Sequence, residues 1–198
     1  MKSQKRRNEI LAAATECFAK RGYHATQVSD IIEAAGIARG TFYLYFESKE
    51  VVFREILDAF LVHIGEQIKT IKLGGALSPA DQMRANVERV VDTIIDNPAP
   101  AKIVFNEAVG LNPEIDEKLR EFYDRLIERT AISLSKGMKL GLVRKTDPRI
   151  GACIILGAFR ELMVQRTVFG NSKISRKAIV EGLLDVLLRG FAGMPVAG

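Results

Sequence analysis

The chain has 198 residues, of which 47% are hydrophobic and 27% are charged, the ordinary proportions of a soluble protein with a sizeable core. No apolar run approaches the roughly 18 residues that predict a membrane span. The basic N-terminus carries Glu9 and Glu16, which interrupt any signal-peptide core. These features predict a cytoplasmic protein without a membrane segment. A net charge of +5 leans toward a nucleic-acid partner but does not establish one.

The residues that usually carry enzyme chemistry are scarce. Cys17 and Cys153 lie far apart in apolar, helix-like segments, which predicts buried free thiols rather than a disulfide or a metal pair. The only histidines are His24 and His63, and the sequence contains no GxGxxG, P-loop or HExxH motif. We therefore predict a protein that is not an enzyme and that holds no metal and no cofactor.

Three short helices are predicted near the N-terminus. The first covers about residues 3–21 and ends at Gly22, after a basic pair. The second begins after an N-cap that is either Thr26 or Gln27, and it ends at Gly36, whose missing Cβ permits a sharp turn. The third covers roughly residues 38–46. This arrangement predicts a helix-turn-helix whose second helix enters a DNA major groove.

A long helix is predicted next, over residues 48–72, with Ser48 as its cap. Its apolar residues recur at i, i+3 and i+4 for more than six turns, which is too long for the small N-terminal unit alone. We expect this helix to link a DNA-binding domain, residues 1–47, to a helical effector-binding and dimerisation domain, residues 48–198.

The remaining chain carries further helix starts and no strand pattern or repeat. Helices are predicted from Pro79, over a short segment from residue 102 to 109, from Asn112 to about Leu140, over 148–169 and over 175–191. The predicted fold is all-α, with about nine helices.

The last two predicted helices, 148–169 and 175–191, are apolar on more than one face. They also contain small residues that permit close helix packing, namely Gly151, Ala152, Gly157, Ala158 and Gly182. A helix buried all round belongs to the centre of a large core or to an oligomer interface. We predict a homodimer through these two helices. The alternative is a monomer that covers them with its own long helix.

The stretch GYHATQVSDIIEAAGIARGTFYLYFESKE, residues 22–50, resembles the TetR family of transcriptional regulators. The resemblance rests on Gly36, the run Gly40-Thr41-Phe42-Tyr43, Phe46 and Lys49. It implies a homodimer that binds a palindromic DNA operator and is released when a small molecule enters the C-terminal domain. The implied function is that of a ligand-responsive regulator, most often a repressor. A helical scaffold that binds only protein is the rival interpretation, but it would need no basic, glycine-containing recognition helix.

The resemblance also implies which residues contact DNA: Arg39, Gly40, Thr41, Tyr43, Tyr45 and Lys49. Arg39 can pair with guanine through two hydrogen bonds, and Gly40 would let the helix backbone approach the DNA closely. Two positions depart from the family pattern. Ala38 stands where Ser or Thr usually caps the recognition helix, and Gln27 replaces a frequent Thr.

An effector cavity is expected among residues 79–169. The candidate lining residues are Phe105, Phe122, Leu126, Phe159 and Met163. Each of them could equally be simple core. Arg160 and Glu161 follow an uncharged stretch, so they could pair with each other, pair with a second subunit or receive a polar group of the ligand. The sequence indicates an apolar or amphipathic effector and does not choose among candidates.

Overall fold

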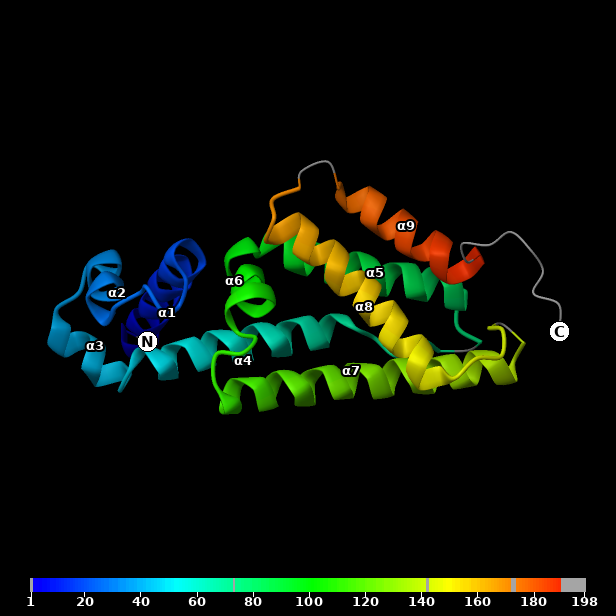
Figure 1. The fold of residues 1–198 in the computed structure, drawn as a ribbon, viewed down its shortest axis with the longest axis horizontal. Helices are drawn as coiled ribbons and strands as arrows, with labels where there is room; N and C mark the ends of the chain where they lie inside the picture. The colour runs from blue at the N-terminus through cyan, green and yellow to red at the C-terminus, as the bar shows by residue number, and fades with distance from the viewer. Residues whose placement is uncertain (1, 73, 142, 172–173, 190–198) are drawn as a thin grey trace. The chain divides into compact units, whose positions relative to one another are not determined.

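The computed structural model describes residues 2–72, 74–141, 143–171 and 174–189 (Figure 1). Within these ranges the chain forms nine α-helices and one π-helical turn, with no strand. The predicted all-α class is therefore confirmed. None of the helices in the described ranges is long and apolar enough to cross a membrane.

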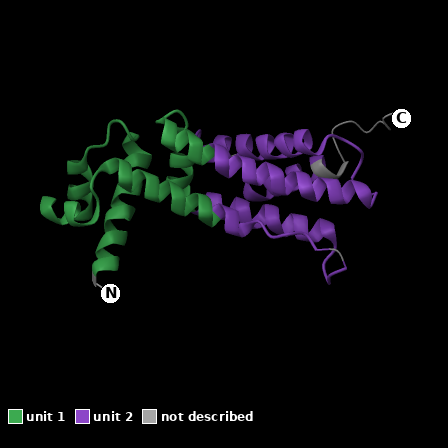
Figure 2. Cartoon of the chain, turned by 90° about the horizontal axis from the view of Figure 1, so that it is seen from below, with its two compact units in different colours: residues 1–63, 97–119 green, residues 64–96, 120–198 purple. Residues whose placement is uncertain are grey.

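The chain packs as two compact units, which Figure 2 colours separately. Unit 1 contains residues 1–63 and 97–119, and unit 2 contains residues 64–96 and 120–198. The segment 97–119 thus packs with the N-terminal helices, although it lies in the middle of the predicted C-terminal domain. The predicted boundary between residues 47 and 48 concerns function rather than packing, and it stays a prediction.

Four helices build the core of unit 1 around phenylalanine side chains. Phe18, Phe42, Phe46 and Phe53 are at most 2% exposed, and the rings of Phe18 and Phe53 meet edge to face at 5.4 Å. Aromatic side chains of this size bury about 150–250 Å² each and dominate the energetics of a small core. Phe42 and Phe46, which carry part of the TetR resemblance, are thus core residues of unit 1. The helices are α1 (Lys2–Arg21), α2 (Val28–Ala35), α3 (Arg39–Tyr45) and the first part of α4 (Lys49–Gln67).

A second part of unit 1 comes from residues 97–119. It comprises α6 (Pro98–Lys102), the π-helical turn η1 (Ile103–Glu107) and the start of α7 (Pro113–Lys139), and both α6 and η1 contact α1. In η1 the Ala108 N–H donates to the Ile103 carbonyl at 2.9 Å, an i to i+5 bond that places one extra residue in the turn. The sequence predicted an apolar segment here, but not its π-helical geometry.

The linking helix is shorter than the predicted 48–72, because α4 ends at Gln67. The carbonyls at a helix C-terminus need outside partners. Arg89 Nε donates to the Gln67 carbonyl at 3.0 Å, and Arg129 Nη2 donates to the Ile68 carbonyl at 2.8 Å. The Asn86 side-chain amide then bonds both the N–H and the carbonyl of Lys69, at 2.9 and 2.8 Å. These tertiary bonds replace the ones that a continued helix would make.

Unit 2 is a helical assembly in which α5 contacts both α8 and α9, and these two contact each other. Its core includes Val91, Ile94, Met163 and Ile179, all at most 1% exposed. The helices are α5 (Pro79–Asp96), the later part of α7, α8 (Pro148–Thr167) and α9 (Arg176–Arg189). Thus α8 stops two residues before the predicted end. The predicted end of the last helix at Phe191 lies outside the described residues.

Side-chain caps explain where the unit 2 helices begin. Asp147 accepts hydrogen bonds from the Arg149 and Ile150 N–H groups at 2.9 and 2.8 Å, which satisfies two free donors at the start of α8. Ser78 caps α5 by accepting the Asp81 N–H at 3.1 Å. Proline at the first helical position of α5 and α8 is the signal that located both starts in the sequence.

Candidate nucleic-acid interface

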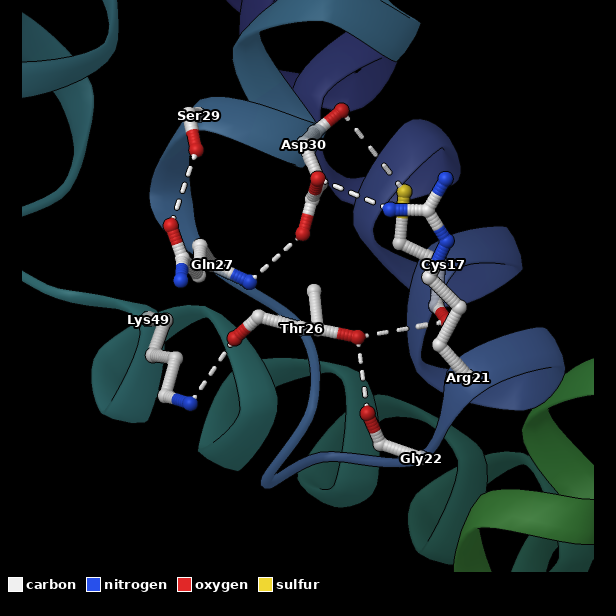
Figure 3. Close-up of polar contacts among 8 residues, drawn as sticks. All are labelled: Cys17, Arg21, Gly22, Thr26, Gln27, Ser29, Asp30 and Lys49. Atoms are coloured by element: carbon white, nitrogen blue, oxygen red, sulfur yellow. Dashed lines mark hydrogen bonds and ion pairs between the residues drawn. The ribbon is translucent and has the colours of Figure 1, made fainter.

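Gln27, rather than Thr26, is the N-cap of α2. The Gln27 N–H donates to Asp30 Oδ2 at 2.8 Å, and Arg21 Nη1 bonds Asp30 Oδ1 at 2.8 Å (Figure 3). These contacts, the Gln27 N–H first, hold the pKa of the Asp30 carboxyl below its usual range. Thr26 is fully buried, and its hydroxyl donates to the Gly22 carbonyl at 2.7 Å. Thr26 therefore stabilises the turn before α2 through a buried hydrogen bond.

The turn between α2 and α3 depends on Gly36. Gly36 has φ +61°, in the left-handed region that glycine favours, and its N–H donates to the Glu33 carbonyl at 3.1 Å. The Ile37 N–H donates to the Ile32 carbonyl at 3.2 Å, which completes the helix end. At the start of α3, Ala38 makes no side-chain cap, as the sequence predicted. The helix-turn-helix geometry is thus set by backbone bonds around one glycine.

One face of α3 is exposed and the other is buried. Arg39, Gly40, Tyr43 and Leu44 are exposed, whereas Phe42 is completely buried. The Arg39 guanidinium carbon lies 5.8 Å from the centre of the Tyr43 ring, so the two side chains form one surface. Thr41 and Tyr45 are half-buried at the edges of this face. The structure thus brings together five of the six predicted DNA contacts on a single seven-residue helix.

Gly40 has no intramolecular reason to be glycine. A Cβ built at this position would meet no atom within 4 Å, and Gly40 is not among the glycines with positive φ. Glycine inside a helix costs about 0.5–1 kcal/mol relative to alanine. A bare backbone on the exposed face of α3 fits a surface that another molecule approaches closely.

Lys49, the sixth predicted contact, is half-buried and already has partners within unit 1. Its Nζ donates to the Tyr23 carbonyl at 3.0 Å and to the Thr26 carbonyl at 2.9 Å, the second of which Figure 3 draws. It also lies 4.4 Å from the centre of the Tyr23 ring. Lys49 therefore ties the start of α4 to the turn that precedes α2. A role in contacting phosphate stays a prediction.

Tyr23 is a buried residue of this region that sequence reasoning missed. It is 6% exposed, its hydroxyl donates to Glu50 Oε1 at 2.8 Å, and its ring meets that of Phe53 at 4.8 Å. Burial is the main cause that raises the pKa of the Tyr23 phenol, and the bond to Glu50 adds to it. The available signal was an aromatic residue directly after a helix-ending glycine.

The predicted effector-binding residues fall into both units. Phe105 lies in η1 of unit 1, where it is half-buried. The other four belong to unit 2: Phe122 and Leu126 on α7 and Met163 on α8 are buried, and Phe159 on α8 is half-buried. The effector-lining role of the five residues stays a prediction.

The two charged residues singled out on α8 do not pair with each other. Glu161 is exposed, and its Oε1 accepts a hydrogen bond from Gln165 Nε2 at 2.8 Å. Arg160 is half-buried and interacts with the Tyr123 hydroxyl. Burial raises the pKa of Tyr123, while the Arg160 charge and hydrogen bond act in the opposite direction. Arg160 of α8 thus lies beside the half-buried Tyr123 of α7.

Comparison with known families agrees with the helix-turn-helix geometry and extends beyond it. The family described as "Bacterial regulatory proteins, tetR family" matches residues 10–56, which cover most of α1 and all of α2 and α3. The domain described as "Tetracyclin repressor-like, C-terminal domain" matches residues 76–164. The chain belongs to the TetR family. As a TetR-family protein it is a DNA-binding transcriptional regulator.

Several TetR-family proteins are similar over almost the whole chain. A curated relative is the fatty acid metabolism regulator protein of Bacillus subtilis, 27% identical over 92% of this chain and 93% of its own length. FadR from Bacillus subtilis in complex with stearoyl-CoA has a TM-score of 0.73 at 26% identity, covering 93% of this chain and 99% of the other. The fatty acid degradation regulator FadR from Bacillus halodurans has a TM-score of 0.75 at 27% identity, covering 94% and 96%.

The exposed face of α3 also contains a residue that the TetR resemblance did not single out. Leu44 is 82% exposed, the largest exposure among the large hydrophobic residues of the described chain. It stands beside Tyr43, which is 47% exposed. Helical spacing could have found Leu44, because residues 40 and 44 are one turn apart and share a face.

Proposed function

We propose that this TetR-family regulator is a repressor that binds a palindromic operator as a homodimer and is released by an acyl-CoA thioester. The observation that carries the DNA-binding part is the exposed face of α3, where Gly40 leaves the backbone bare between Arg39 and Tyr43. Arg39 would pair with a guanine edge through its two-pronged guanidinium. Thr41, Tyr43 and Tyr45 would contact phosphates or thymine methyl groups, and Lys49 would contact phosphate.

The dimer part of the proposal rests on the exposed face of α8. Ile150 and Ile154 are 61% and 66% exposed, and they are one helical turn apart. The exposed residues Cys153, Gly157 and Ala158 continue this face at helical spacing. Cys153 is a free thiol as predicted, but the prediction that it is buried was wrong. A face of large apolar and small side chains is suited to close packing against its own copy across a two-fold axis. On α9, Ala178 and Gly182 are exposed as well.

A two-fold dimer gives the short recognition helix its specificity. Two recognition helices would bind half-sites about one DNA turn apart, or a multiple of it, and such half-sites form a palindrome. A single α3 offers only a few base contacts, whereas the dimer doubles them within one complex. The small DNA-binding unit therefore needs the larger helical body.

The effector part rests on similarity together with the interior of unit 2. One similar protein, FadR from Bacillus subtilis, was solved with stearoyl-CoA and resembles this chain over almost its full length. In unit 2, Phe122, Leu126 and Met163 are buried apolar side chains that could surround an acyl chain. Arg160 supplies a positive charge beside Tyr123, suited to an oxygen-rich head group. A long-chain acyl-CoA has both parts.

Regulation rather than catalysis is the proposed role, since the full-length relatives are transcriptional regulators. We place its action in the cytoplasm, where an operator on the bacterial chromosome is accessible. Release would follow from a shift in population. Effector binding would favour a conformation whose two recognition helices no longer fit the operator. For this to happen, the effector must bind the released conformation more tightly than the DNA-binding conformation.

Selection of duplexes from a random DNA library by the wild-type protein tests the proposal. We expect enrichment of one palindromic sequence, binding of a protein dimer to it, and release by palmitoyl-CoA but not by free coenzyme A. The Arg39→Ala variant should still bind DNA but with a relaxed base preference, while Arg39→Lys should restore charge without the guanine preference. If no sequence is enriched, the proposed DNA-binding role is excluded. If neither palmitoyl-CoA nor other acyl derivatives release the protein from its operator, the proposed effector class is excluded.

A further inference from the structure

A single carboxylate connects the π-helical turn η1 to the turn that precedes α2. Glu107 Oε2 accepts the Tyr23 N–H at 3.0 Å, although the two residues are 84 positions apart in the chain. A Cβ at Gly22 would lie 3.0 Å from the same oxygen, so the close approach uses the glycine at that position. Asn106 Nδ2 donates to Glu107 Oε1 at 2.7 Å and helps to orient the carboxylate.

The same turn is also bound to α4. Lys49 Nζ bonds the carbonyls of Tyr23 and Thr26, and the Tyr23 hydroxyl bonds Glu50. The turn 22–26 is therefore held by α4 at its carbonyls and by η1 at its N–H. Gln27 follows directly and is the N-cap of α2, so a displacement of the turn reaches the first residue of the helix-turn-helix.

The segment that carries Glu107 is continuous with unit 2 at both ends. Residue 97 follows the last residue of α5, and α7 runs without interruption from unit 1 into unit 2. A movement of α5 or α7 would therefore be transmitted along the chain to η1. A π-helical turn suits such a segment, because it is an uncommon geometry that can revert to an α-helical register. That change would carry Glu107 further round the helix axis and away from Tyr23.

We propose that Glu107 is a positioning residue through which residues 97–119 set the placement of the turn 22–26, and with it the affinity for DNA. The inference rests on the proposed effector-controlled repression, and it assigns part of that control to one hydrogen bond. Coupling between two sites requires an element with two arrangements that both sites bias. Here that element is η1 with its Glu107–Tyr23 bond, acting beside α4.

The test compares Glu107→Ala with Glu107→Gln in the full-length protein. Glutamine keeps an oxygen that can accept the Tyr23 N–H, whereas alanine does not. Operator affinity is measured by fluorescence anisotropy on the selected duplex, with and without palmitoyl-CoA. We expect the ratio of operator affinity without palmitoyl-CoA to operator affinity with it to shrink by about tenfold in Glu107→Ala. This is the scale of one hydrogen bond to a charged acceptor. In Glu107→Gln the ratio should change less than threefold. Lys49 still holds the turn in both variants, so both should fold.

Glu121→Ala is the matched control, because Glu121 is an exposed residue of α7 that pairs with Arg125 one helical turn away. A purely structural role for Glu107 would lower the melting temperature and weaken DNA binding equally with and without palmitoyl-CoA. An unchanged affinity ratio in Glu107→Ala would overturn the inference.

A second measurement separates this inference from the proposed effector class. If palmitoyl-CoA does not change the operator affinity of the wild type, the acyl-CoA proposal fails. Amide hydrogen exchange then tests the positioning role of Glu107 independently. We expect the Tyr23 amide and the amides of α2 to exchange at least tenfold faster in Glu107→Ala than in Glu107→Gln. Equal exchange in the two variants would refute the positioning role on its own.

Discussion

Substituting Gly40 by alanine should strengthen the fold and weaken DNA binding. Within the chain a methyl group at this position meets no atom within 4 Å, and the residue does not have positive φ. Alanine in a helix is favoured over glycine by about 0.5–1 kcal/mol. For a chain of this length a gain of about 1 kcal/mol corresponds to roughly 2–4 °C in melting temperature. The variant should therefore melt slightly above the wild type.

The loss of DNA affinity follows from where the methyl group points. Gly40 lies on the exposed face of α3 between Arg39 and Tyr43, so a Cβ there would face the major groove if the proposed docking is right. A displacement that costs about 1.4 kcal/mol reduces affinity tenfold. We expect at least that loss for each recognition helix, and about a hundredfold loss for a dimer that uses both.

Gly65 provides a matched control for this experiment. It also lies inside an α-helix, has no positive φ and would meet no atom within 4 Å after substitution by alanine. Gly65→Ala should gain similar stability and keep wild-type affinity for the operator. The two quantities are measured by thermal denaturation and by fluorescence anisotropy. Wild-type affinity in Gly40→Ala would refute close approach of the DNA to this backbone.

Three further predictions follow from other contacts. Ile154→Glu should convert the dimer into a monomer, as measured by sedimentation velocity. Val62→Glu, at a similarly exposed position on α4, should remain a dimer. A dimeric Ile154→Glu protein would exclude the α8 interface. Lys49→Ala should lower the free energy of unfolding by about 1–3 kcal/mol, because two hydrogen bonds from a charged group are lost. A phosphate contact would instead reduce the slope of log affinity against log salt by about one unit with stability unchanged. The bond from the Ser48 hydroxyl is the main cause that lowers the pKa of Glu50. The ionised carboxylate therefore stabilises the fold above the unfolded-state pKa of about 4.3. This contribution is lost as the pH falls through the lower pKa of the folded protein. Glu50→Gln should therefore lose less stability than the wild type between pH 6 and pH 3 in chemical denaturation, and an identical pH dependence would contradict that assignment.

Local signals explain why much of the fold was predictable from the sequence. Gly22 and Gly36 end α1 and α2 with positive φ, as their positions after basic or apolar helical runs indicated. Prolines 79, 113 and 148 mark the first residues of α5, α7 and α8. Such signals act through the chain's own backbone, so they need no knowledge of distant residues. The residues expected on the exposed face of α3 came instead from the TetR resemblance, which did not include Leu44.

The features that sequence reasoning missed depend on partners far away in the chain. The apolar pattern of α4 continues past Gln67, but the helix ends there, and Arg89 and Arg129 bind the carbonyls of Gln67 and of Ile68, the residue after it. The family pattern marks Lys49 as a surface cation, whereas two buried carbonyls already occupy its ammonium group. Likewise, no pattern within residues 103–107 predicts a π-helical turn. The end of α4 and the placement of Lys49 are decided by tertiary hydrogen bonds, which helical periodicity does not contain.

The short length of α3 connects these observations to the control of DNA binding. A seven-residue helix without a side-chain cap is far below the roughly 12–15 residues at which an isolated helix becomes marginal in water. Its order must therefore come from what it packs on, namely α2 and the core around Phe42. The helix α2 itself begins directly after the turn 22–26. An effector need not move α4 as a rigid lever to abolish binding, since loosening that turn would already raise the entropy that DNA binding has to remove. Lys49 holds the turn at two carbonyls and Glu107 holds it at the Tyr23 N–H. In the mechanism proposed above, release of one of these contacts would be enough to lower operator affinity.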